Sequence, residues 1–295
     1  MDQLGIAIAI LSTFMLGSNK LAVRKSLFDI DESLASFIAI FVAIPIFGFP
    51  ILIFGWGPGN LTFSVVLIFV IAGVLNYSAG RYFIWKSIGA IGANRGNTLA
   101  SSQVLYAIII AIVFLGQTVD LVSGIGIIFV LAGIFIISYR SFSNTPFSKK
   151  ELRIGITSGI VGGFLWGISQ VLMQIGISEY SNATSASFVT FVAGLIGILP
   201  VLYAADRLSP KSAFRVTKKG VFYAFVGGLL GTFGLFFRYV ALETIPLTIV
   251  STINGINPIV TLVLSYFLIR NVEYIDRRTI VGIVASVIGV ALLSY

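Results

Sequence analysis

The sequence predicts an all-α polytopic membrane protein with ten transmembrane helices arranged as two inverted repeats of five helices. Apolar residues make up 57% of the 295 residues and charged residues only 10%. A soluble domain has roughly 45–50% apolar and about 25% charged residues. Mean hydropathy is +1.04. Because a spanning helix needs about 20 apolar residues, the chain has room for ten spans and short connections, and we expect no separate soluble domain.

The expected spans are apolar runs of membrane-crossing length that follow one another along the chain. They lie at residues 4–23, 34–54, 63–85, 96–115, 121–139, 154–177, 186–205, 221–242, 248–269 and 280–295. No positively charged segment precedes the first run, which begins just after Met1-Asp2-Gln3. We therefore expect that run to be a membrane span and not a removable signal peptide.

The basic residues are distributed unevenly between the two sides of the membrane. All but Arg238 of the 19 Lys and Arg residues fall in or beside the connections that follow odd-numbered spans. The positive-inside rule assigns these connections to the cytoplasm, which puts both termini outside it, in a multi-pass protein of the cell (plasma) membrane. Because the net charge of +8 is explained by these loops, we expect no nucleic-acid binding.

The two halves of the chain repeat each other in order. Gly5 and Gly17 in the first run recur as Gly155 and Gly167 in the sixth, and residues 35–38 (ASFI) recur as residues 186–189 (ASFV). We therefore divide the chain into one repeat over residues 1–145 and a second over residues 146–295. With an odd number of spans in each repeat, the second copy is inverted. Inverted repeats are typical of secondary transporters, whose substrate site lies at the midplane between them.

Polar and large aromatic residues inside the spans are the candidates for a substrate site, because polar groups are costly in hydrocarbon and by default mark a pathway. For single residues other roles stay open: Ser and Thr can bond to their own backbone, basic side chains can extend to the headgroups, and aromatic rings can form interfacial belts. The candidate substrate-binding residues are Asn19, Lys20, Asn76, Tyr77, Arg81, Thr98, Ser102, Gln103, Tyr106, Trp166, Gln170, Gln174, Arg238, Tyr239 and Asn254.

Several chemistries are disfavoured by the residues that the chain lacks. It has no Cys and no His, the residues that most often provide a nucleophile, a general base or a transition-metal ligand. We expect no enzyme activity, no metal and no cofactor. No carboxylate lies in the middle of a span, which disfavours proton-coupled export of cationic drugs. Lys20 and Arg81 instead favour a substrate with a carboxylate or phosphate.

Short stretches along the whole chain resemble the EamA-type, ten-helix form of the drug/metabolite transporter superfamily. These stretches are residues 16–20 (LGSNK), residues 166–170 (WGISQ), and residues 239–248 (YVALETIPLT) followed by Asn257-Pro258. The sequence departs from the family pattern in three respects. Val104 stands at the position that matches Pro258 in the other repeat, Gln117 and Asn271 replace the usual acidic residue, and the family's usual cytoplasmic termini differ from the orientation that the charges predict.

From the repeat, the polar residues and the resemblance together, we predict a secondary transporter. It would move a small polar metabolite, such as an amino acid or another organic anion, by alternating access. The alternatives on the same fold are an exchanger of nucleotide sugars, sugars or phosphate esters, and an exporter of drug-like compounds. A membrane-embedded transferase and a passive channel fit less well. The expected partners are a small-molecule substrate and the lipid bilayer, and we expect a monomer.

Overall fold

The computed structural model is helical throughout the part of the chain that it describes, which contains no strand. That part consists of residues 3–54, 61–103, 105–106, 109–110, 121–138, 147–180, 182–208, 216–245, 250, 253–269 and 275–293. The described helices, in chain order, are α1 (Gln3–Ser26), α2 (Glu32–Phe54), α3 (Phe63–Gly73), η1 (Val74–Gly80), α4 (Arg81–Ile91), α5 (Ala93–Ala100), α7 (Leu121–Ser138), α8 (Lys149–Glu179), α9 (Ala183–Leu208), α10 (Lys218–Thr244), α12 (Asn257–Leu268) and α13 (Arg277–Leu293).

Helices long and apolar enough to cross a membrane confirm the polytopic class. Within the described residues there are 6 such helices, and shorter apolar helices cover Gly124–Gly133 and Ile253–Leu268. The expected spans at residues 96–115 and 248–269 run partly outside the described residues, so the count of ten stays a prediction. The predicted division between residues 145 and 146, and the departures at Val104, Gln117 and Asn271, also lie outside the described residues.

Local signals set where several helices begin. Ser148 precedes α8 and forms a capping box with Glu151, in which each side chain accepts a hydrogen bond from the other residue's backbone. Pro258 occupies the first turn of α12, where its missing N–H breaks no hydrogen bond. Between α4 and α5 stands the single residue Gly92, with φ of 92°. Glycine adopts this conformation readily, so the chain changes direction there without a longer loop.

The third span, Phe63–Ile91, contains a π-helical segment at its centre. Residues of η1 are wound more widely than in the α-helices on either side, and π-helical segments are rare and often found at functional sites. At the end of α3, a Cβ on Gly73 would overlap the backbone of Thr190 in α9. This glycine therefore allows α3 and α9 to approach closely, as small residues do between membrane helices.

Helices from the two halves of the chain pack side by side in opposite directions. Ser12 Oγ of α1 donates to Gly234 O of α10 at 2.7 Å, and Asn19 Nδ2 donates to Gly227 O at 2.6 Å. From the first bonded pair to the second, the residue number rises by seven in α1 and falls by seven in α10. The two helices are therefore antiparallel. Gly155 and Gly162 of α8 pack on Ile91 and Ile84 of α4 in the same antiparallel sense. These close pairs form the walls of the central cavity.

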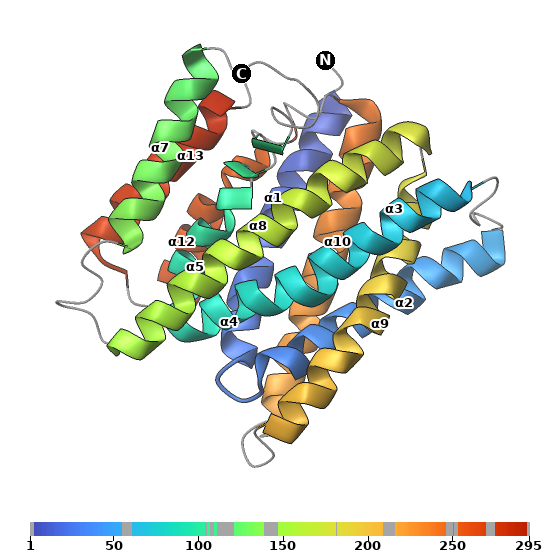
Figure 1. The fold of residues 1–295 in the computed structure, drawn as a ribbon, viewed down its shortest axis with the longest axis horizontal. Helices are drawn as coiled ribbons and strands as arrows, with labels where there is room; N and C mark the ends of the chain where they lie inside the picture. The colour runs from blue at the N-terminus through green and yellow to red at the C-terminus, as the bar shows by residue number, and fades with distance from the viewer. Residues whose placement is uncertain are drawn as a thin grey trace.

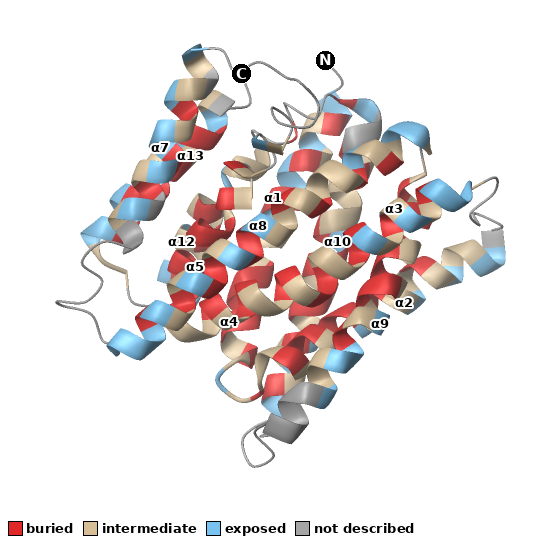
Figure 2. Cartoon of the chain, viewed as in Figure 1, coloured by how far each residue is buried: buried red, intermediate tan, exposed pale blue. Residues whose placement is uncertain are grey.

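Helices α7 and α13 form a separate pair at one edge of the molecule (Figure 1). Gly133 of α7 lies against Ser286 of α13, and Gly289 of α13 lies against Val130 of α7. In Figure 1 the beginning of α1 and the end of α13 lie toward the same edge of the molecule. Buried residues concentrate where the helices face one another, while large apolar side chains such as Leu52 and Leu121 are exposed (Figure 2). This distribution is that of a bundle surrounded by lipid.

Candidate functional site

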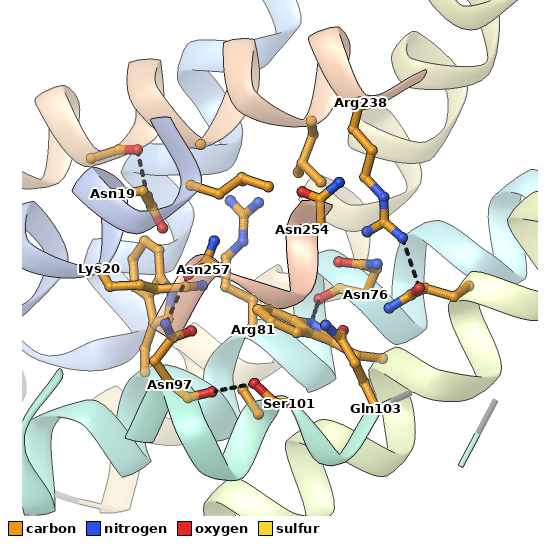
Figure 3. Close-up of a pocket in the computed structure, with 18 of the residues that line it drawn as sticks. Asn19, Lys20, Asn76, Arg81, Asn97, Ser101, Gln103, Arg238, Asn254 and Asn257 are labelled. Carbon is orange, nitrogen blue, oxygen red and sulfur yellow. Dashed lines mark hydrogen bonds between the residues drawn. The ribbon is translucent and has the colours of Figure 1, made fainter. Parts of the chain in front are cut away.

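A cavity of about 100 Å³ lies at the centre of the bundle. It is enclosed by α1, η1, α4, α5, α8, α10, α12 and the short stretch before α12, so both halves of the chain contribute (Figure 3). The lining residues are Leu16, Asn19, Lys20, Asn76, Arg81, Trp85, Asn97, Ala100, Ser101, Gln103, Trp166, Gln170, Gly227, Gly228, Gly231, Leu235, Arg238, Asn254 and Asn257. The cavity is small beside the roughly 300–1,000 Å³ typical of sites for drug-sized ligands.

Lys20 and Arg81, which we call the cationic pair, both line the cavity, and each lies over an indole ring, Lys20 over Trp166 and Arg81 over Trp85. The Lys20 ammonium sits 4.7 Å from the centre of the Trp166 ring, and Trp166 packs against Gly80, the residue before Arg81. Both cationic side chains are buried, with 6% and 7% of their surface exposed. A buried cation stabilised only by ring faces keeps much of its desolvation cost. The cationic pair is therefore suited to binding an anion.

Arg81 is held among aromatic rings. Its guanidinium carbon lies 4.9 Å from the ring centre of Tyr77, 5.6 Å from that of Trp85 and 5.9 Å from that of Phe191. No residue within the described part of the chain hydrogen-bonds to the Arg81 side chain. The rings fix the direction of the guanidinium and leave its N–H groups available to a ligand.

Arg238 supplies a third cation from α10. Its Nη2 donates to Gln170 Oε1 of α8 at 2.8 Å. Gln170 is neutral, so this contact orients the guanidinium without cancelling its charge. In Figure 3, Arg238 and the cationic pair approach the cavity from different sides.

Amide side chains supply most of the remaining polar surface of the cavity. Asn97 Nδ2 of α5 donates to Asn257 Oδ1 at 2.8 Å and to Thr261 Oγ1 at 2.9 Å, which connects α5 to α12. Asn76 Nδ2 of η1 donates to Ser169 Oγ at 3.2 Å, and Asn76 O accepts from Trp166 Nε1 at 3.0 Å. The amides thus bind helices of opposite halves together at the cavity wall.

All the charged side chains that line the cavity are cations. None of the lining side chains, all of which belong to the described part of the chain, is acidic. The sequence supports this, since the chain has only 11 acidic residues and those that fall within helices lie close to the helix ends, as Glu151, Glu179 and Glu243 do. Three cations therefore face one small cavity, and no carboxylate among its described lining residues balances their charge.

The structure brings together predicted site residues from both halves of the chain. The predicted residues that line the cavity are Asn19, Lys20, Asn76, Arg81, Gln103, Trp166, Gln170, Arg238 and Asn254. The predicted residues that lie outside its lining are Tyr77, Thr98, Ser102, Tyr106, Gln174 and Tyr239.

Tyr77 and Tyr239 lie behind the cavity wall and contact each other. Their hydroxyl oxygens are 3.2 Å apart, and both side chains are buried. The Tyr77 ring also stacks on Phe191, with 4.1 Å between ring centres. The same Tyr77 ring contacts the Arg81 guanidinium. Instead of stacking on a ligand, as the sequence suggested, this pair supports Arg81 and joins η1 to α10.

The remaining predicted residues face other parts of the structure. Thr98 Oγ1 donates to Asn94 O at 2.8 Å within α5, and Ser102 lies against Gly163 of α8. Tyr106 packs edge-on against Phe164, with ring centres 5.2 Å apart. Gln174, one turn beyond Gln170 on α8, is exposed. Residues 98, 102 and 106 do share a helix face, but in the structure residues of that face contact α8 or their own backbone and not the cavity.

Other residues that line the cavity were not selected from the sequence. Asn97 and Ser101 occupy the helix face adjacent to Thr98 and Ser102, and a helical spacing alone does not say which of two neighbouring polar faces points inward. Asn257 is a polar residue of the span expected at residues 248–269 and part of the family-like motif, but it is not among the predicted site residues. Trp85 and Leu235 carry no polar signal, and only the packing of the helices reveals their place.

A bundle of long apolar helices around a buried polar cavity defines a polytopic membrane protein with a central solute-sized site. The model of the EamA-like transporter family matches residues 3–139 and again residues 153–295. The chain therefore belongs to this family of the drug/metabolite transporter superfamily, whose members are transporters, and it is a multi-pass membrane protein.

Comparison with solved proteins supports the same fold. A crystal structure that is 12% identical in sequence matches with a TM-score of 0.66, over 99% of this chain and 98% of the other. At that identity the likeness shows the fold alone. No curated protein matches this chain.

Proposed function

We propose that this chain is a secondary transporter of a small organic anion that carries a carboxylate or phosphate group. The observation that carries the proposal is the cavity itself, in which Lys20, Arg81 and Arg238 meet without an acidic side chain in its described lining. Charge-assisted hydrogen bonds from Lys and Arg are the usual means of binding carboxylate and phosphate. Desolvation strengthens these bonds, and the ligand supplies the missing negative charge.

Among organic anions, the same lining favours those without an ammonium group. A zwitterionic amino acid would place its ammonium in a cavity that already holds three cations. The lining amides could accept hydrogen bonds from it, but they provide no negative charge. An acid with hydroxyl or keto groups suits the amides better, because amides both donate to and accept from such groups. We therefore rank amino acids below other organic anions as substrates.

We further propose that the transporter works by alternating access between two inverted five-helix repeats, residues 1–145 and 146–295. Three observations support this arrangement: the family model matches twice along the chain, α1 runs antiparallel to α10, and α7 packs against α13. In such transporters the substrate site lies where the repeats meet, which is where the cavity is found. A carrier of this kind requires no enzymatic step.

For orientation, we propose a cell-membrane protein with both termini outside the cytoplasm, as the charges predict. The chain has no Cys, so single cysteines can be introduced without background. We expect Lys150→Cys, in the first turn of α8, to react with an impermeant maleimide only after the cytoplasmic face is exposed. We expect Gln3→Cys to react in intact cells. The opposite pattern would refute this orientation.

The test of the proposed function is counterflow in proteoliposomes. Vesicles are loaded with one unlabelled compound from a panel of organic acids, phosphate esters, sugars, amino acids and amines, and uptake of the labelled compound is measured. We expect saturable counterflow with carboxylate- or phosphate-bearing members. Exchange of only amines or neutral compounds would refute the proposal.

Phosphate esters and nucleotide sugars are the second candidate substrates, because the cationic pair could equally bind phosphate. The volume of the cavity, about 100 Å³, favours small phosphate esters over nucleotide sugars. Competition by small phosphate esters, but not by carboxylic acids, would select this alternative.

A further inference from the structure

The cations of the cavity are placed at two different depths. Asn19 and Ser12 of α1 bond to Gly227 and Gly234 of α10, so Lys20 is level with residue 226 of α10. Arg238 lies twelve residues further along the same helix, which is about 18 Å of helix rise. The backbones that carry Lys20 and Arg238 are therefore well separated along the axis of the bundle.

The charged ends of these side chains nevertheless converge on neighbouring turns of α8. The Lys20 ammonium lies over Trp166 at 4.7 Å, and Arg238 Nη2 bonds to Gln170 at 2.8 Å. Trp166 and Gln170 are four residues apart, or about 6 Å of rise. One cationic centre thus consists of the cationic pair, with Lys20 over Trp166 and Arg81 over Trp85. A second consists of Arg238, which bonds to Gln170, one helical turn from Trp166.

Burial makes both centres require a counter-charge. The Lys20 and Arg81 side chains are almost fully buried, and Arg238 has its Nε buried without a hydrogen-bond partner among the described residues. A monoanion that bound to the cationic pair would leave Arg238 facing only the neutral Gln170. A ligand with an anionic group at each end would satisfy both centres together.

We infer that the substrate is a two-ended dianion, a short dicarboxylic acid whose carboxylates bind the cationic pair at one end and Arg238 at the other. This inference rests on the proposed function and names the class of anion. Asn254 and Gln103 are amides that line the same cavity (Figure 3). They would bind hydroxyl or keto groups on its short carbon chain.

The test compares each diacid with its own monomethyl ester in proteoliposomes. Malonate, succinate, glutarate and adipate are measured as competitors of labelled succinate, each beside the half-ester, which has nearly the same size but one charge fewer. We expect at least one diacid to compete about tenfold or more better than its half-ester, as loss of one charge-assisted hydrogen bond implies. We also expect an optimum at intermediate chain length.

Two variants assign the two ends. In Arg238→Gln the preference for the diacid over its half-ester is expected to fall about tenfold, whereas in Arg81→Gln both compounds are expected to lose affinity together. Gln174→Ala, in the same helix as Gln170 but exposed, is the matched control and should retain the wild-type preference.

The outcomes separate this inference from the proposed function. Equal competition by diacid and half-ester, or an Arg238→Gln variant with the wild-type preference, would refute the two-ended dianion while leaving anion transport intact. Stronger competition by glycerol phosphate than by every diacid would show that both charges bind at one centre, which also refutes it. No counterflow with any carboxylate or phosphate would refute the proposed function itself.

Discussion

Replacement of Arg81 by Gln should weaken anion transport without weakening the fold. Arg81 lines the cavity and contacts the rings of Tyr77, Trp85 and Phe191, but no described residue hydrogen-bonds to its side chain. A hydrogen bond between charged groups contributes about 1.5–3 kcal/mol. At about 1.4 kcal/mol for each factor of ten, losing it should raise the apparent KM for the anion roughly 10- to 150-fold.

The same change has opposing effects on stability. Loss of the cation–π contacts costs about 0.5–2 kcal/mol. Removal of a buried, uncompensated charge relieves a desolvation penalty of several kcal/mol. Because the second quantity is at least as large as the first, the ligand-free Arg81→Gln variant should have a Tm equal to or above that of the wild type. Its Tm should rise much less than that of the wild type at the same concentration of anion.

Arg24→Gln is the matched control for Arg81→Gln. Arg24 is buried as well, but its Nη1 donates to Ile88 O at 2.8 Å and to Gly89 O at 2.6 Å near the end of α4. Its loss should lower the Tm, while the folded fraction should keep the wild-type KM. Both variants are assayed for counterflow in proteoliposomes and for thermal unfolding in detergent. A wild-type KM in Arg81→Gln, or a fall in its ligand-free Tm as large as that of Arg24→Gln, would refute the reasoning.

Two further predictions concern packing. Gly73→Ala would drive a Cβ into the backbone of Thr190 and should destabilise the protein by about 1–3 kcal/mol. Its control is Gly124→Ala, where a Cβ would meet nothing within 4 Å, and this variant should stay within about 0.5 kcal/mol of the wild type. Equal melting temperatures for the two variants would contradict this account. Asn97→Ala removes two hydrogen bonds between α5 and α12, one of them to Asn257, and should cost about 1–2 kcal/mol at the values measured between membrane helices. An unchanged unfolding midpoint in a denaturant titration would show that this connection contributes nothing.

The sequence predicts the membrane-spanning helices well because their signal is strong and local. Long apolar runs and short basic connections indicated the six long helices, with ends that differ by up to six residues, as in Phe63–Ile91 against the expected 63–85. The family match confirms the class of protein. The π-helical segment at Val74–Gly80 has no such signal, since its residues resemble those of any apolar span. The turn at Gly92 was also missed, because a single glycine between two helical stretches does not reveal its φ angle.

The candidate site could be predicted only in part, for a physical reason. The cost of burying charges and amides in hydrocarbon is the reason Lys20, Arg81 and Arg238 were candidates, and all three line the cavity. The choice between neighbouring faces of one helix depends on how the helices rotate against each other, and that is decided by packing. Because the sequence does not specify this rotation, Tyr77 and Thr98 were predicted to line the site and do not. Trp85 and Asn97 were not predicted, yet they line the cavity.

Thermal unfolding of the purified protein in detergent, with and without candidate ligands, tests the cationic cavity most directly. A ligand that binds only the folded protein raises its Tm, by an amount that corresponds to about 2.7 kcal/mol at one hundred times its Kd. The account predicts stabilisation by small carboxylate- or phosphate-bearing anions, diacids above all, and a much smaller stabilisation of Arg81→Gln at the same anion concentration. Stabilisation by amines or neutral compounds alone would contradict it, since Lys20, Arg81 and Arg238 would then not bind the substrate.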